Sequence, residues 1–211
     1  MADLILFDLD GTLTDPEEGI TNSVVYALKP YGIEETNANC RRFIGPPLGP
    51  ELQKVYGLDP RESVLRFREY FEDKGIYENK LYPDTIQVLE TLKKAGKTLA
   101  VATSKPEVSA EIVLKHFGIR QYFDGVFGAS LDESKVHKAD IIQEALDAFP
   151  GQSAIMIGDR EHDILGAKAH GLPSIGVLSG FGSRQELEDA GADIIVNSLA
   201  DTLPCLLDEK S

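Results

Sequence analysis

Two aspartates near the start of the chain, Asp8 and Asp10, have a spacing that suits covalent phosphoryl chemistry. They directly follow the apolar run at residues 4–7, which predicts a buried strand, and they precede a Gly-Thr turn. Because alternate residues of an extended chain project the same way, both carboxylates can enter one pocket. Close carboxylates repel, so the pair needs a shared proton or a divalent cation. An Asp N-cap followed by an Asp-Gly turn would also explain the pattern.

A second acidic pair lies far along the chain. The apolar run at residues 154–158 predicts another strand and ends in Asp159, and Asp163 follows near the first turn of a helical pattern. Both carboxylates can face one site. Magnesium prefers oxygen ligands and takes one or two carboxylates together with water and substrate oxygens. Helix capping explains either aspartate alone, but two acidic pairs at two strand ends favour a common site.

Hydroxyl and lysine side chains between the acidic pairs can bind phosphate. A third strand candidate ends in Thr103 and Ser104, where a hydroxyl and neighbouring backbone N–H groups can hold phosphate oxygens. Both are also ordinary turn residues. Lys138 precedes a helical pattern and could supply a positive charge, with Lys135 as a rival. A solvated surface lysine is the alternative for each.

Taken together, these residues resemble the four motifs of the haloacid dehalogenase-like phosphohydrolases. The resemblance spans almost the whole chain and is strongest to the phosphoglycolate phosphatase-like branch. It rests on Asp8-Leu-Asp-Gly-Thr-Leu, on Phe-Ile-Gly-Pro-Pro-Leu at residues 43–48 and on Gly-Asp-Arg-Glu-His-Asp-Ile-Leu-Gly-Ala at residues 158–167. Ser104 departs from the Asn that commonly follows the threonine in phosphoglycolate phosphatases, which bears on the glycolate substrate and not on the reaction type.

The resemblance implies a role for each motif. Asp8 would be the nucleophile that takes the phosphoryl group, and Asp10 the general acid and later the base for water. Thr103, Ser104 and Lys138 would bind the phosphoryl group, and it is the resemblance that favours Lys138 over Lys135. Magnesium would be bound by Asp8, by Asp10 through its backbone carbonyl and by Asp159, with Asp163 as a further or water-mediated ligand. Positioning and charge neutralisation supply most of the rate of such a reaction.

The order of the expected elements predicts an α/β fold with a doubly wound parallel sheet, which binds ligands at the carboxyl ends of its strands. All four motifs fall at such ends. Strands are expected near residues 4–8, 98–103, 126–129, 154–158, 174–178 and 193–196. Helical patterns cover residues 85–95, 108–117, 139–148, 164–170 and 184–190.

Residues 15–82 interrupt this alternation with helical patterns and no convincing strand. We therefore expect a helical cap at 15–82, inserted into a catalytic core formed by residues 1–14 and 83–211. Within it, Arg41, Arg42 and the turn at Gly45 are candidates for contacting the part of the substrate that does not react. Basic surface residues beside a stiff loop would explain the same pattern. The Gly-rich loop at residues 179–183 could border the mouth of the pocket, or serve only as a turn into the next helix.

Composition excludes several classes of protein. The chain has 211 residues and a formal net charge of −14, which disfavours nucleic acid as a partner. No apolar run approaches the roughly 18 residues of a membrane span, and no secretory segment is visible, so we expect a cytoplasmic protein without a membrane partner. Cys40 and Cys205 lack metal-ligand spacing and are expected as free thiols. The expected assembly is a monomer or homodimer.

The sequence thus predicts a magnesium-dependent phosphatase of small phosphorylated metabolites, with phosphoglycolate and nucleoside 5'-monophosphates as first substrates. A sugar-phosphate mutase would share all four motifs. A receiver-type signalling domain is a remote alternative, because receivers are shorter and place adjacent acids after the first strand. A haloacid dehalogenase fits less well, since carbon-halogen chemistry does not require the metal that Asp10, Asp159 and Asp163 suit.

Overall fold

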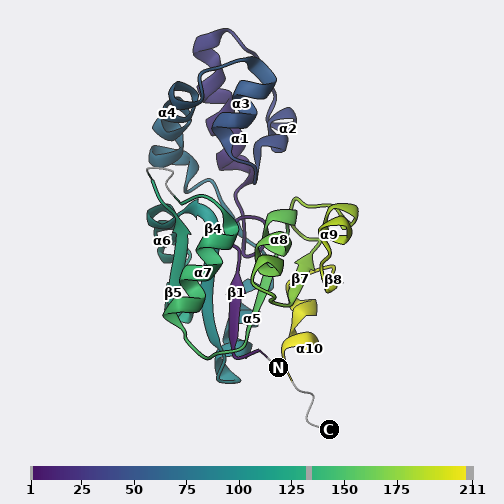
Figure 1. The fold of residues 1–211 in the computed structure, drawn as a ribbon. Coiled ribbons are helices and arrows are strands. Elements are labelled where there is room, and N and C mark those ends of the chain that lie inside the picture. The colour runs from purple at the N-terminus through teal and green to yellow at the C-terminus, as the bar shows by residue number, and fades with distance from the viewer. Residues whose placement is uncertain (1, 132–134, 208–211) are drawn as a thin grey trace. The chain divides into compact units, whose positions relative to one another are not determined.

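The structure is a computed structural model, which describes residues 2–131 and 135–207 (Figure 1). Strands and helices alternate along most of the chain, and one long stretch near the N-terminus is almost entirely helical. No helix in the described part of the chain is both long enough and apolar enough to cross a membrane.

The chain divides into two compact units. The first combines Met1–Thr14 with Leu81–Ser211, and the second is Asp15–Lys80. Leu81 and Tyr82, which we expected in the insertion, therefore belong to the first unit. The segments that lead into and out of the second unit, β2 (Thr14–Asp15) and β3 (Lys80–Leu81), form a two-stranded sheet.

The first unit is built on a six-stranded sheet in the order β5-β4-β1-β6-β7-β8, and every neighbouring pair is parallel. The expected doubly wound α/β architecture is therefore confirmed. The strands are β1 (Leu4–Phe7), β4 (Thr98–Pro106), β5 (Gly125–Ala129), β6 (Ala154–Gly158), β7 (Ser174–Val177) and β8 (Ile194–Val196).

Strand β1 lies at the centre of this sheet, and its four residues are completely buried. Continuous apolar strands of this kind form where helices cover both faces of a parallel sheet. Phe7, the last residue of β1, pairs with Val101 of β4 and Ile157 of β6. Strands β1 and β6 thus end at nearly the same level, and β4 runs on past them to Pro106. The residues that follow β1 and β6 are therefore brought close together.

Helices lie beside this sheet (Figure 1). They pack against it through apolar side chains. Ile141 and Ile142 of α7 join Leu6 of β1, Met156 of β6 and Ala167 of α8 in one buried cluster. The helices of the first unit are α5 (Thr85–Lys94), α6 (Glu107–His116), α7 (Lys138–Ala148), α8 (Glu161–Ala169), α9 (Arg184–Ala190) and α10 (Leu203–Leu206), with short 3-10 turns η4 (Arg120–Tyr122) and η5 (Ala200–Thr202).

The strand order reverses at β1. From β1 the chain adds β4 and β5 on one side of the sheet, and then β6, β7 and β8 on the other. In doubly wound sheets this switch point opens a crevice at the carboxyl ends of the strands, where ligands bind. Asp8 is the first residue after β1, and Asp159 the first after β6.

The second unit is helical and has its own core. Val24, Leu28, Cys40, Phe43 and Leu52 form a buried cluster between its helices. The elements are α1 (Glu17–Leu28), α2 (Asn37–Cys40), α3 (Leu48–Tyr56) and α4 (Pro60–Tyr70), with 3-10 turns η1 (Lys29–Tyr31) and η2 (Arg41–Phe43) and a π-helical turn η3 (Phe71–Gly75). A self-contained core lets this unit fold as a compact body.

Candidate active site

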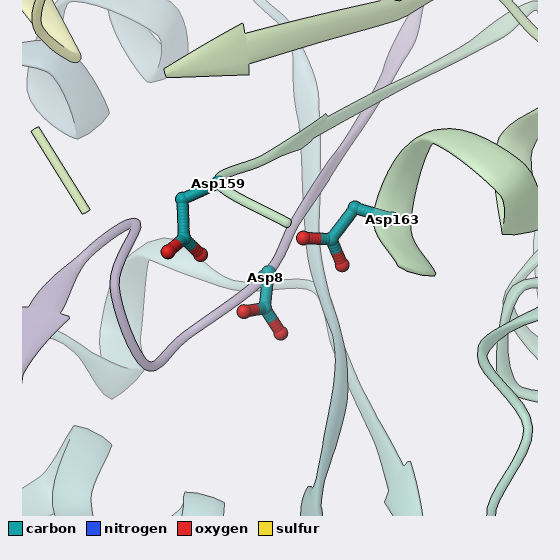
Figure 2. A group of neighbouring side chains, drawn as sticks. All are labelled: Asp8, Asp159 and Asp163. Carbon is teal, nitrogen blue, oxygen red and sulfur yellow. The ribbon is translucent and has the colours of Figure 1, made fainter. Parts of the chain in front are cut away.

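Three buried aspartates form the centre of the candidate site (Figure 2). Asp8 follows β1, Asp159 follows β6, and Asp163 lies in the first turn of α8. One carboxylate oxygen from each lies within 4.8 Å of the others. The backbone N–H of Asp8 donates to the carbonyl of Ile157 at 2.9 Å, which ties the ends of β1 and β6 together. The two acidic pairs predicted from sequence thus contribute to one cluster.

Lys138 supplies the positive charge of this cluster. It is the first residue of α7, and its Nζ lies 2.7 Å from Asp8 Oδ1 and 2.7 Å from Asp163 Oδ1, and donates to the carbonyl of Ala102 at 2.9 Å. Burial alone would lower the pKa of this ammonium, but the carboxylates of Asp163 and Asp8 outweigh burial and raise it. Lys138 is therefore a permanent cation between two carboxylates.

Lys135, the rival of Lys138, lies elsewhere. Its ammonium pairs with Glu144 on α7, and this glutamate is exposed. Lys138 reaches the cluster because the start of α7 packs beside α8: a Cβ on Gly166 would lie 2.8 Å from Lys138 Cγ. Only a residue without a side chain leaves room there for the lysine stem.

Asp159 is held by neutral donors. Its Oδ2 accepts the backbone N–H of Phe181 at 2.8 Å, and its Oδ1 accepts the hydroxyl of Thr12 at 3.4 Å. Burial, with added repulsion from Asp163 and Asp8, raises the pKa of Asp159 well above its usual range. A carboxylate in this setting gains greatly from a bound cation, because no lysine or arginine makes a direct ion pair with it in the described residues.

The loop at residues 179–183 has a role that sequence reasoning missed. Besides the Phe181 N–H, it brings Gly180 so close that a Cβ there would lie 2.3 Å from Asp159 Oδ2. From its sequence, this loop was expected either to border the pocket or to form a turn. Its two glycines were the available signal, since glycine permits close approach of backbone to another group.

Asp163 contacts both the helix terminus and the lysine. Its Oδ2 accepts the backbone N–H of Arg160 at 3.1 Å, which caps α8, while its Oδ1 pairs with Lys138. Burial raises the pKa of Asp163 and the ammonium of Lys138 partly offsets this, so that the pKa is about 6. A Cβ on Gly158 would lie 2.2 Å from Asp163 Oδ2, so glycine is required at the end of β6.

Asp10 lies beside the cluster and is bound to a different lysine. Its Oδ2 is 2.8 Å from Lys105 Nζ, and its Oδ1 accepts the hydroxyl of Thr14 at 3.4 Å. Lys105 was not among the residues expected at the site. The available signal was its spacing from Thr103, because residues two apart in an extended strand project to the same side.

The two hydroxyl residues at the end of β4 have different environments. Thr103 is 1% exposed, and its Oγ1 accepts the backbone N–H of Lys105 at 3.2 Å. Ser104 is exposed. Strand β4 continues to Pro106, farther than the sequence indicated, with a register shift against β5 between Thr103 and Pro106.

Arg41, Arg42 and Gly45 lie in the second unit. Arg42 is bound by that unit itself: its Nη2 donates to Glu35 at 3.1 Å and to the Tyr56 hydroxyl at 2.6 Å. Arg41 is more exposed and pairs with Glu17 at 3.2 Å. Gly45 has a φ of 100°, which is characteristic of a glycine turn. Contact of these residues with substrate stays a prediction.

The fold and the acidic cluster suit phosphoryl transfer, and comparison with known proteins identifies the family. Residues 5–177 match the model of the haloacid dehalogenase-like hydrolases, and the chain belongs to that family. It is 46% identical over 189 residues to a 5'-nucleotidase of Pseudomonas aeruginosa, covering 87% of this chain and 86% of the relative. The chain is therefore a phosphatase, a phosphoric monoester hydrolase of this family.

Further similarities extend over nearly the whole chain. A solved structure from Clostridium acetobutylicum, described as a predicted phosphatase, is 45% identical with a TM-score of 0.90 and covers 95% of this chain and 96% of its own. The tyrosine-protein kinase PtkA of Mycobacterium tuberculosis is 35% identical over 199 residues, which are 92% of this chain and 68% of the kinase. A solved structure from Haemophilus somnus, described as a predicted phosphoglycolate phosphatase, is 26% identical with a TM-score of 0.83 and covers 98% of this chain and 98% of its own.

Proposed function

We propose that this phosphatase hydrolyses small phosphorylated metabolites with magnesium, through an aspartyl-phosphate on Asp8. The observation that carries the proposal is the position of Asp8: buried at the switch point of the sheet, with one carboxylate oxygen held by Lys138 at 2.7 Å. The interaction with Lys138 orients Asp8 and leaves its second oxygen for attack on phosphorus. A buried, oriented carboxylate is suited to covalent catalysis.

The charges around Asp8 support a divalent cation. When the three carboxylates of Asp8, Asp159 and Asp163 are ionised, the single ammonium of Lys138 leaves two negative charges uncompensated. Asp8, Asp159, Asp163 and the backbone carbonyl of Asp10 would hold magnesium, which prefers such oxygen ligands. When bound, the ion would neutralise the cluster and the charge of the transferring phosphoryl group.

The residues of the chain then carry out two displacements. In the first, an oxygen of Asp8 bonds to phosphorus while the bond from phosphorus to the leaving oxygen breaks, and Asp10 donates a proton to that oxygen. In the second, Asp10 takes a proton from water, whose oxygen attacks phosphorus and releases inorganic phosphate and free Asp8. Thr103, Ser104 and Lys138 would bind the phosphoryl oxygens during both steps.

For substrate, we favour nucleoside 5'-monophosphates, with phosphoglycolate as the second choice. The identity of 46% to a 5'-nucleotidase supports the nucleotide. The second unit would act as the cap that selects the substrate. Arg41 is the better candidate for an anionic contact, because Arg42 is already bound to Glu35 and Tyr56.

The decisive experiment is Asp8→Asn with Asp147→Asn as its matched control. Asp147 is an exposed aspartate on α7 that accepts a hydrogen bond from Gln143. Phosphate release from a metabolite panel should stop in Asp8→Asn, keep its wild-type rate in Asp147→Asn, and require magnesium. Retention of more than a few per cent of activity by folded Asp8→Asn would remove the aspartyl-phosphate mechanism.

Acid quenching with radiolabelled substrate distinguishes related activities. Hydroxylamine cleaves an aspartyl-phosphate. Phosphotyrosine, which a tyrosine kinase such as the relative PtkA is named for making, is stable in hydroxylamine. A sugar-phosphate mutase would convert one sugar phosphate into another and release little inorganic phosphate. Labelled inorganic phosphate together with a hydroxylamine-sensitive protein label is the result expected here.

A further inference from the structure

A second buried lysine, Lys105, lies beside the site and has no part in the reaction as proposed above. Its side chain is only 5% exposed, and its Nζ lies 2.8 Å from Asp10 Oδ2. Burial of an ammonium is costly unless it is paired and hydrogen-bonded. The ion pair therefore indicates that the local fold holds the Lys105 ammonium against the carboxylate of Asp10.

The backbone around Lys105 directs its side chain inward. The register of β4 against β5 shifts between Thr103 and Pro106, where Lys105 lies. Strand irregularities of this kind change the direction of a side chain and are frequent beside active sites. The N–H of Lys105 also donates to Thr103 Oγ1 at 3.2 Å. A Cβ on Gly128 of β5 would lie 2.7 Å from the carbonyl oxygen of Lys105, so close packing holds this segment.

Lys105 makes the short contact to Asp10. Its Nζ lies 2.8 Å from Oδ2, whereas the hydroxyl of Thr14 lies 3.4 Å from Oδ1 and equally 3.4 Å from the carbonyl of Leu9, which competes for its one proton. The side chain of Asp10 is 18% exposed, more than that of Asp8 at 10%, so it retains access to solvent. A general acid that must later act on water needs such access together with a fixed direction.

We propose that Lys105 is a positioning residue for Asp10, holding its carboxyl group in the orientation for proton transfer to the leaving group and from water. The inference rests on the proposed function and assigns the two lysines that are buried in the described part of the chain to different carboxylates. Lys138 serves Asp8 and Asp163, and Lys105 serves Asp10.

The test measures how the effect of Lys105→Met on kcat/KM depends on the leaving group of the substrate. For an alkyl phosphate, whose leaving oxygen needs a proton, kcat/KM should fall about tenfold to hundredfold. This is less than most of the roughly 10²–10⁴ that general acid–base catalysis supplies, because Asp10 itself remains. For 4-nitrophenyl phosphate, whose leaving group needs none, kcat/KM should change less than threefold. Attack of water should slow on both, so a burst of nitrophenolate should appear and phosphorylated enzyme should accumulate.

The matched control is Lys93→Met. Lys93 also forms an ion pair at 2.8 Å, with Asp124, and takes no part in the site. It should leave both substrates unaffected. The ratio of the two kcat/KM values does not depend on the amount of active enzyme, so partial unfolding of Lys105→Met cannot imitate the effect. If that variant does not fold, Lys105→Gln carries the same comparison.

A double variant shows whether Lys105 acts through Asp10. Adding Lys105→Met to Asp10→Asn should cost less than threefold more on the alkyl phosphate, because the group that Lys105 positions is already lost. Equal losses of Lys105→Met on both substrates, or full additivity with Asp10→Asn, would overturn the inference. Absence of any leaving-group dependence in Asp10→Asn itself would instead overturn the role of Asp10 in the proposed function.

Discussion

Replacing Lys138 by methionine should separate the charge of this residue from its packing. Methionine keeps an unbranched apolar stem in the space beside Gly166 but removes the ammonium that contacts Asp8 and Asp163 at 2.7 Å. Loss of one partner from a buried ion pair costs about 3–5 kcal/mol. At roughly 2–4 °C per kcal/mol for a protein of this size, the melting temperature should fall by roughly 6–20 °C.

The activity of Lys138→Met should fall by about 10²–10³, the usual effect of removing one preorganised charge from a transition state. Melting is best followed by circular dichroism, because the chain has no tryptophan. Lys135→Met is the control, since the ion pair of Lys135 with Glu144 lies near the surface and such pairs contribute about 0–1 kcal/mol. Magnesium should raise the melting temperature more in Lys138→Met than in the wild type.

Two outcomes would refute this reasoning. Equal melting temperatures for the two methionine variants would mean that the Lys138 ion pairs contribute no net stability. Near wild-type turnover by Lys138→Met, or a larger loss in Lys135→Met, would remove Lys138 from the phosphoryl site.

Three further predictions concern the metal ligands and the substrate. Gly158→Ala should lower activity at least tenfold and raise the magnesium requirement, because its Cβ would lie 2.2 Å from Asp163 Oδ2; unchanged magnesium titrations would contradict this. Protons and magnesium should compete for Asp159, whose pKa is raised, and for Asp163, whose pKa is about 6. Acids whose pKa is raised by folding destabilise the metal-free protein as they ionise with rising pH. The gain in melting temperature on adding magnesium should therefore increase from pH 5 to pH 8. A gain that stays constant over this range would contradict the linkage. Arg41→Ala should lower kcat/KM about tenfold on the best natural anionic substrate, equivalent to about 1.4 kcal/mol, and leave a small aryl phosphate unaffected; equal losses on both would make Arg41 structural.

Local sequence pattern was sufficient for most of the first unit. Apolar runs such as residues 4–7 and 154–158 form buried strands. A short apolar run between turn signals is typical of a strand that is buried on both faces. The alternation of such runs with helical patterns determined the doubly wound sheet. Asp8 and Asp159 were predicted to meet because residues that follow neighbouring parallel strands share one edge of the sheet.

Sequence was less informative where a contact depends on distant segments. The choice between Lys135 and Lys138 could not be made from residue type, since both precede the same helix. Packing of α7 beside Gly166 places Lys138, and not Lys135, between two carboxylates. The length of β4 was also underestimated, because the Ser-Lys-Pro segment has turn composition yet pairs with β5 up to Pro106.

The sequence by itself therefore determined the fold class, the family and the acidic residues that meet at the switch point. Periodicity, strand ends and motif spacing are properties of neighbouring residues in the chain. They can therefore be recognised without knowing which distant segments pack against them. Only the tertiary structure decided that the Phe181 N–H holds Asp159 and that Lys105 holds Asp10. These contacts join residues far apart in the chain, and they depend on strand register and on glycine close approaches that no local pattern records.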